Sequence, residues 1–143
     1  MASSSVKSET IESLIYAEQA RQNGRFIENT NLEQYISKIK NNSEIISHNI
    51  AGECAGFVAF YCNNLESREA YITLVLTNPR LRGMNIAKNL VTMALVSAQK
   101  RGFKTCALEV RNNNQNAIRL YESLGFSDFE QTGNSKIMKV SLS

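Results

Sequence analysis

The stretch "LEVRNNNQNAIRLYESLGF", from Leu108 to Phe126, carries the most information in this sequence of 143 residues. It starts as an apolar strand, passes through a polar loop and continues as a short amphipathic helix that ends at Gly125. A carboxylate, Glu109, interrupts the apolar strand, and Tyr121 lies on the apolar side of the helix. The pattern predicts a strand–loop–helix unit with one ionisable side chain on each element.

A second stretch, "NPRLRGMNIAKNL", lies between a strand-like apolar run and a long helical pattern. Pro79 prevents a simple continuation of strand pairing, so a turn and a helix start are expected here. Such a turn presents free backbone N–H groups and the positive end of the helix dipole, which together favour a pyrophosphate. Arg82 adds a full positive charge, and Asn85 tolerates left-handed backbone angles better than other non-glycine residues.

Hydrophobic periodicity places the remaining elements. Thr30 and Glu33 predict a capping box for the second helix, and residues 70–77 form a continuous apolar run typical of a strand covered on both faces. The helix from Asn85 is expected to bury a stripe formed by Ile86, Leu90, Met93, Ala94 and Ser97. We predict helices over 8–25, 30–42, 85–102 and 114–125, and strands over 44–49, 54–62, 70–77, 104–110, 126–131 and 135–142.

Composition limits the function classes. With 43% hydrophobic and 20% charged residues and no apolar run near the roughly 18 residues that span a bilayer, the chain is expected to be a cytoplasmic protein without a membrane partner. The net charge of +3 is spread along the chain, which argues against a nucleic-acid partner. A single histidine, His48, and three cysteines without CxxC spacing predict no metal site and reduced thiols.

Taken together, the two stretches resemble the GNAT superfamily of N-acetyltransferases, over roughly residues 70–140. "RLRGMNIA" is similar to the family's acetyl-CoA loop, with Arg82 first, Ala87 last and Asn85 where a glycine is usual. The family's C-terminal motif is matched by Asn114, Ala117, Ile118, Leu120, Tyr121, Gly125 and Phe126. The resemblance implies an α+β fold with a mixed, mostly antiparallel sheet and helices on both faces. Residues 1–8 are expected to be a disordered tail and residues 9–143 a single N-acetyltransferase domain.

The resemblance also implies acetyl-CoA as cosubstrate. In the GNAT fold the strand before the loop splays from its neighbour and lends backbone groups to the pantetheine arm, and one N–H group can polarise the thioester carbonyl. Asn114 would meet the cofactor, or act only as a helix cap. The expected acetyl-CoA-binding residues are Val75, Leu76, Thr77, Arg82, Gly83, Met84, Asn85, Ile86, Ala87 and Asn114.

For the chemistry, an amine must lose a proton and the departing thiolate must gain one. Tyr121 is the expected acid, because a phenol with a pKa near 10 is reasonably matched to a thiol near 8.5. Glu109 is the expected base, because an apolar strand would desolvate it and make it a stronger base, and "LEVR" followed by "AIRLYESLGF" resembles the ribosomal-protein N-terminal alanine acetyltransferases. Glu69 is the alternative base.

The acceptor is an amine, either on a protein N-terminus or lysine or on a small molecule such as an amino sugar, and a homodimer is compatible with the sequence. Helices in the N-terminal half normally shape the acceptor site, yet Glu18, Arg21, Arg25 and Glu28 are expected to face water. GNAT domains usually open with a strand, which Met1–Ser8 is too polar to indicate. A non-catalytic acyl-CoA sensor or scaffold of the same fold is the competing hypothesis.

Overall fold

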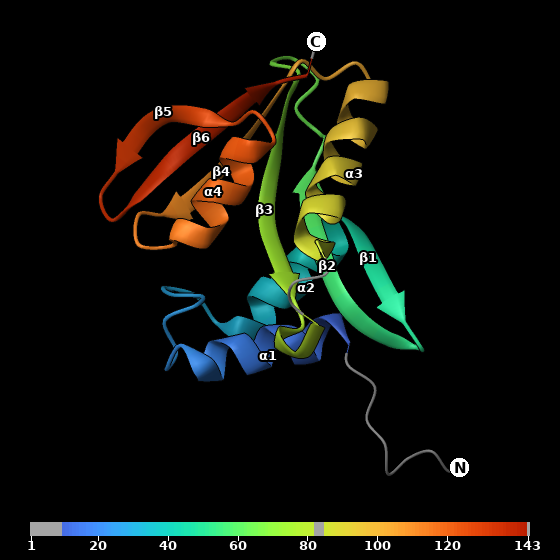
Figure 1. Ribbon diagram of the computed structural model, residues 1–143, viewed down its shortest axis with the longest axis vertical. Coiled ribbons are helices and arrows are strands. Elements are labelled where there is room, and N and C mark those ends of the chain that lie inside the picture. Colours follow the sequence, from blue (N-terminus) through green and yellow to red (C-terminus); the bar gives the residue numbers. More distant parts are fainter. Residues whose placement is uncertain (1–9, 82–84, 143) are drawn as a thin grey trace.

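The computed structural model describes residues 10–81 and 85–142 (Figure 1). The expected tail, together with Arg82, Gly83 and Met84, lies outside these residues. The described elements are α1 (Ile11–Arg21), α2 (Leu32–Asn42), β1 (Glu44–Ile50), β2 (Glu53–Tyr61), β3 (Glu69–Thr77), a 3-10 turn η2 (Pro79–Leu81), α3 (Ile86–Lys100), β4 (Thr105–Arg111), α4 (Gln115–Ser123), β5 (Ser127–Thr132) and β6 (Ser135–Ser141).

The six described strands form one sheet in the order β1-β2-β3-β4-β6-β5. Strands β3 and β4 pair in parallel, with α3 as the crossover between them, and the other neighbouring pairs are antiparallel. This arrangement confirms the expected α+β class and the mixed, mostly antiparallel sheet. Among the described residues, no helix is both long and apolar enough to cross a membrane.

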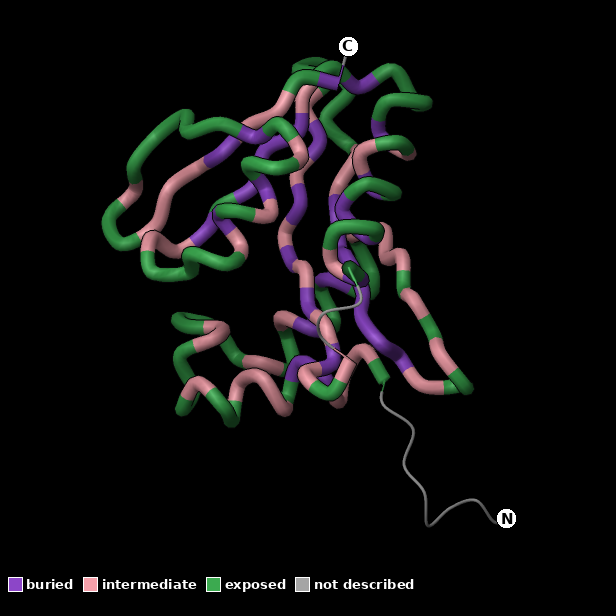
Figure 2. The backbone as a smooth tube through the Cα atoms, in the orientation of Figure 1, coloured by how far each residue is buried: buried purple, intermediate pink, exposed green. Residues whose placement is uncertain are grey.

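Two apolar cores lie on opposite faces of the sheet. Helices α3 and α4 cover one face, through a core that includes Leu90, Val91, Leu108 and Met138. Helices α1 and α2 cover the other face over β2 and the second half of β3, through a core that includes Phe57. Figure 2 shows the buried residues concentrated along the central strands, whereas the edge strand β5 is exposed over most of its length. The expected helices on both faces are therefore confirmed.

Strand β3 contributes to both cores because it contains a β-bulge. Ala59 is opposite Leu74 and Phe60 is opposite Ile72, so Thr73 is an extra residue in β3. Ala70 and Ile72 belong to the core under α3, whereas Leu74 and Leu76 belong to the core under α1 and α2. A bulge shifts the alternation of side chains by one residue. The apolar run of residues 70–77 thus supplies both faces in turn, as a strand covered on both faces requires.

Two local predictions were wrong. The capping residue of α2 is Asn31, whose side chain accepts a hydrogen bond of 3.1 Å from the Gln34 backbone N–H, and not Thr30 paired with Glu33. Asparagine caps a helix at least as well as threonine, so the helix begins one residue later than the pattern suggests. Met93 is 41% exposed. The buried residues of α3 are Ile86, Leu90, Val91, Ala94 and Ala98, so three of the five expected residues are confirmed, whereas Ser97 is only half-buried.

Gly56 allows β2, β3 and the start of α3 to approach one another closely. A Cβ atom at this position would lie 3.0 Å from the Leu76 carbonyl oxygen and 3.0 Å from Cγ2 of Ile86. Both neighbours adjoin the turn that leads from β3 into α3. A methyl group at this position is therefore accommodated only if these neighbours shift by a few tenths of an ångström.

We expect Gly56→Ala to lower the free energy of unfolding by about 1–3 kcal/mol, because the β3 backbone would have to move to admit the methyl group. Urea denaturation followed by circular dichroism measures the change. The control is Ser47→Ala on β1, an exposed position at which a change within about 0.5 kcal/mol is expected. Equal stability of Gly56→Ala and the native protein would show that this close approach is not needed.

Candidate active site

The candidate site lies where β3 and β4 separate. Their pairing runs from Glu69 opposite Thr105 to Ile72 opposite Leu108 and does not continue toward the ends of the two strands. A cavity of about 530 Å3 occupies this opening. Its lining residues are Glu18, Gln22, Phe26, Ile27, Tyr35, Ile72, Thr73, Leu74, Val75, Leu108, Glu109, Val110, Arg111, Asn113, Asn114 and Tyr121. The splay that the resemblance implied is present, and the cavity passes through it.

The opening joins the two faces of the sheet. Tyr121 belongs to the core on the α3 and α4 side, as do Leu108 and Val110 of β4. Because side chains alternate along a strand, Glu109 and Arg111 project to the opposite face, on the side of α1 and α2. Both expected catalytic residues, Tyr121 and Glu109, line this one cavity. A cofactor on one face can therefore meet an acceptor that approaches from the other.

Tyr121 lies in an apolar setting on α4. The residue is 9% exposed, and its ring packs against Phe126 with the ring centroids 5.7 Å apart. Burial raises the pKa of Tyr121 to about 12, because desolvation penalises the phenolate. The phenol therefore keeps its proton at neutral pH, although it is less closely matched to a thiolate than an ordinary tyrosine.

Glu109 differs from its expected environment. It is exposed, so the desolvation expected from its apolar strand is absent. The reason is that α1 and α2 cover β2 and β3 but leave this face of β4 open. Glu109 still influences its surroundings, because its charge adds to desolvation in raising the pKa of Tyr71. A carboxylate is thus present at the cavity, in contact with solvent.

Glu69, the alternative base, is not brought to the cavity. It opens β3 at the end where the strand still pairs with β4. Its carboxylate accepts a hydrogen bond of 3.1 Å from the Thr105 hydroxyl and forms a 3.1 Å ion pair with Lys139. These contacts hold the Glu69 carboxylate against β4 and β6, away from the cavity. Of the two candidate bases, Glu109 is the one that lines the cavity.

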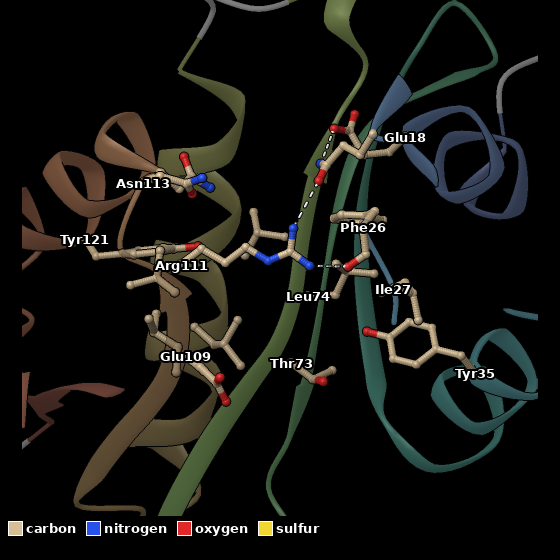
Figure 3. A pocket seen from close by; sticks show the side chains of 16 residues that line it. Glu18, Phe26, Ile27, Tyr35, Thr73, Leu74, Glu109, Arg111, Asn113 and Tyr121 are labelled. Atoms are coloured by element: carbon tan, nitrogen blue, oxygen red, sulfur yellow. Dashed lines mark hydrogen bonds between the residues drawn. The ribbon is translucent and has the colours of Figure 1, made fainter. Parts of the chain in front are cut away.

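Arg111 crosses the cavity and had no predicted role. Its Nη1 donates to Oε1 of Gln22 at 3.2 Å, and its Nη2 donates to the carbonyl oxygens of Arg25 and of Phe26, the latter at 3.1 Å. Nη2 also lies 3.6 Å from the Glu28 carboxylate. In Figure 3 Arg111 reaches from β4 across to the segment that follows α1. This one side chain therefore ties the α1–α2 loop to the end of β4.

Other lining residues were also missed. Glu18 was expected to face water, yet its side chain is 12% exposed, lines the cavity and accepts hydrogen bonds from Arg21 and Gln22. Tyr35 lines it from α2, and burial raises the pKa of this phenol, with Thr73 acting in the opposite direction. Thr73, the bulged residue, also lines the cavity, and there was a hint of this in the sequence because Thr73 is a polar residue inside an apolar strand.

A second cavity, of about 420 Å3, lies at the start of α3. Asn85 adopts the left-handed conformation expected of it (φ 57°, ψ 26°), and its side chain makes no capping hydrogen bond. Counting only partners among the described residues, the first paired N–H in the helix is that of Asn89, which donates to the Asn85 carbonyl at 3.0 Å. Among the described residues, the backbone N–H groups of Ile86, Ala87 and Lys88 in the first turn of α3 thus have no partner and can meet a ligand. The cavity is lined by Thr77, Leu81, Asn85, Ile86, Ala87, Lys88, Asn116 and Leu120.

The expected cofactor residues divide between these cavities. Val75 and Asn114 line the cavity between the strands, and Thr77 lines the one at α3. Leu76 lines neither, since its side chain is buried under α1 and α2. Asn114 is also the helix cap of α4, where its side chain accepts from the Ala117 N–H at 3.3 Å. Arg82, Gly83 and Met84 lie outside the described residues.

We expect Asn85→Gly to bind acetyl-CoA at least as tightly as the native protein, because glycine keeps the left-handed conformation and removes a side chain from the approach of a phosphate. Isothermal titration calorimetry measures the affinity. The comparison variant is Asn85→Ala, in which the left-handed backbone is costly and weaker binding is expected. Markedly weaker binding by Asn85→Gly would instead indicate a direct contact of the asparagine amide with the ligand.

Comparison with known proteins decides the family. A model of the Acetyltransferase (GNAT) family matches residues 10–126, which include both cavities. The chain belongs to this family. Solved GNAT structures share its fold. The ribosomal-protein-S18-alanine N-acetyltransferase of Escherichia coli superposes with a TM-score of 0.70 at 23% identity, covering 96% of this chain and 92% of that one. The PaiA N-acetyltransferase of Thermoplasma acidophilum, solved with coenzyme A, gives a TM-score of 0.65 at 21% identity, covering 96% and 81% of the two chains.

Relatives with higher identity match shorter segments. An uncharacterised N-acetyltransferase of Methanocaldococcus jannaschii is 39% identical over 85 residues, covering 57% of this chain and 38% of that protein. The ribosomal protein bS18-alanine N-acetyltransferase of Escherichia coli is 34% identical over 70 residues, covering 49% of this chain and 47% of that protein. The matches thus span less than half the length of these relatives. They support the GNAT assignment and leave the acceptor open.

Proposed function

We propose that residues 9–143 form a single N-acetyltransferase domain that moves an acetyl group from acetyl-CoA to a primary amine by direct attack in a ternary complex. The observation that carries the proposal is that Tyr121 and Glu109 line one cavity, from opposite faces of the sheet, at the splay between β3 and β4. Cys54, Cys62 and Cys106 form no disulfide with one another, which supports a cytoplasmic location.

The chain offers a suitable place for each part of acetyl-CoA. The N–H groups of the first turn of α3, which have no partner within the described part of the chain, and the positive end of the helix dipole suit the pyrophosphate. Beyond Ile72, the edge of β3 that faces β4 has no strand partner among the described residues, so its backbone groups can bind the pantetheine amides. One of these N–H groups would also polarise the thioester carbonyl. The described residues therefore fit the cosubstrate.

Tyr121 and Glu109 have complementary roles in this proposal. The amine nitrogen forms a bond to the thioester carbonyl carbon, and the carbon–sulfur bond then breaks. Tyr121 gives its phenolic proton to the departing sulfur, and Glu109, directly or through water, takes the proton that the amine loses. The exposure of Glu109 suits its role as proton acceptor, because the proton must finally reach solvent.

The test combines binding and turnover. Calorimetry with acetyl-CoA and release of free coenzyme A thiol are measured against a panel of peptide N-termini, lysine peptides, amino sugars and polyamines. We expect binding together with thiol release for at least one class of amine. Tight binding without release for any amine would favour a non-catalytic acyl-CoA sensor, and failure to bind would contradict both hypotheses.

A disulfide reagent that detects released coenzyme A also reacts with accessible cysteines of the protein itself. We expect the protein's own cysteines to react slowly. Burial raises the pKa of Cys106 to about 12 and also raises the pKa of the half-buried Cys62. Cys54 is 5% exposed. The thiolate is the reactive form, so the native protein should expose at most one slowly reacting thiol to a disulfide reagent. All three should react after denaturation, and rapid reaction of two or more in the native state would contradict this burial.

A further inference from the structure

A third cavity, which is lined by polar residues, adjoins the cavity that holds Tyr121 and Glu109. It measures about 460 Å3 and lies between the α1–α2 loop, the β4–α4 loop and the β5–β6 turn. Its lining residues are Arg25, Glu28, Arg111, Asn112, Asn113, Asn134 and Ser135. Arg111 and Asn113 also line the cavity that holds Tyr121 and Glu109. The two cavities are thus neighbours along one groove, with Arg111 in their shared wall, and we call them the inner and outer cavities.

The charges along this groove are ordered. The inner cavity carries the carboxylates of Glu18 and Glu109, which suit an ammonium group. The outer cavity is lined by Arg25 and, on the wall that it shares with the inner cavity, by Arg111, with Glu28 as its single carboxylate, 3.6 Å from Arg111. An acceptor with separated charges would therefore bind with its amine inward and its anion outward.

Arg25 provides the free donors of the outer cavity. Within residues 10–81 and 85–142 its guanidinium has no hydrogen bond or ion pair, whereas Arg111 is engaged by the α1–α2 loop. The side-chain amides of Asn112, Asn113 and Asn134 add neutral donors. A backbone hydrogen bond of 2.9 Å from the Asn112 N–H to the Asn134 carbonyl fixes this part of the wall. The planar guanidinium fork matches carboxylate and phosphate oxygens.

We propose that the outer cavity is an acceptor subsite for an anionic group, a carboxylate or a phosphate, and that Arg25 is its principal ligand. The inference rests on the proposed acetyl transfer, because it assigns a preference to the acceptor of that reaction. The preferred substrate is an amine that carries an anionic group several bonds from the reacting nitrogen. An acidic peptide with a free N-terminus and a small amine with a carboxylate or phosphate share this chemistry.

Paired acceptors test the proposal. Peptides with a free N-terminal alanine and glutamate, glutamine or lysine at the third position form one arm. Amino sugars with and without a phosphate form the other. In the native protein, kcat/KM for the anionic member of at least one arm should exceed that of its neutral counterpart by about five- to tenfold, and the difference should shrink at high salt. The arm that shows the preference identifies the source of the anion.

Charge reversal supplies the decisive variant. Arg25→Glu should abolish or invert the preference, whereas Lys38→Glu, the same charge change on an exposed face of α2, should leave it unchanged. Equal rates for anionic and neutral acceptors in both arms, or a preference that survives Arg25→Glu, would overturn the subsite while leaving acetyl transfer intact. Absence of transfer to every amine would overturn the proposed function itself, and the subsite with it.

Discussion

Replacement of Tyr121 by phenylalanine is expected to lower kcat by about 10²- to 10³-fold and to leave the Kd for acetyl-CoA within about twofold of the native value. In the proposed mechanism the phenol donates a proton to the departing sulfur, whereas its ring packs beside Phe126. Phenylalanine keeps the ring and removes only the hydroxyl group, and with it the proton that the mechanism needs. Stopped assays of coenzyme A release, together with calorimetry of acetyl-CoA binding, separate these two effects.

The pKa of Tyr121 adds a second expectation. Burial raises it to about 12, so the phenol stays protonated throughout neutral and mildly alkaline solution. In the native protein kcat should therefore show no decline assignable to this group up to about pH 9.5. An unchanged rate in Tyr121→Phe, with native melting behaviour in both proteins, would remove Tyr121 as the acid. A variant with lowered acetyl-CoA affinity as well would point to a structural role.

Replacement of Arg111 by alanine is expected to raise KM for the acceptor about tenfold, with kcat for bound acceptor and affinity for acetyl-CoA much less affected. The side chain holds the loop after α1 through Gln22 and the carbonyls of Arg25 and Phe26. Without it, this wall of the acceptor groove is no longer fixed. Arg111 is therefore a positioning residue, and hydrogen exchange of the amides in residues 22–28 should become faster in the variant.

Two further variants separate positioning from charge. Glu28→Gln removes the exposed ion pair but keeps the hydrogen bonds to the loop, so a change in KM below about twofold is expected with a neutral acceptor. Arg111→Lys retains the charge but has no planar fork to reach several acceptors, and should give an intermediate KM. Unchanged hydrogen exchange in Arg111→Ala would contradict the positioning role. A rise in KM in Glu28→Gln as large as that in Arg111→Ala would contradict it as well.

The local parts of this fold were predictable because they depend on neighbouring residues. The apolar run within residues 104–110 and the helical spacing around Tyr121 indicated β4 and α4, and the splay between β3 and β4 came from the resemblance. The backbone conformation of Asn85 also followed from its chemistry. Where two adjacent residues cap equally well, as with Thr30 and Asn31, the sequence could not decide between them.

The acceptor side was not predictable, since it depends on how distant segments meet. Whether Glu109 is buried is set by how far α1 and α2 extend over the sheet, and they stop short of it. Arg111 gains its role from backbone carbonyls some 85 residues away in sequence. Glu18 and Tyr35 have the spacing of ordinary helical residues, and only the packing of α1 and α2 brings them to the cavity.

The most direct test of acetyl transfer is mass spectrometry of both the acceptor and the intact protein after incubation with acetyl-CoA. We expect an amine of the panel to gain one acetyl group when the protein is present. Because the proposed transfer is direct, the mass of the protein itself should remain unchanged in the absence of an amine. Binding of acetyl-CoA without acetylation of any amine, or an acetylated protein that passes its acetyl group to the amine, would contradict this account.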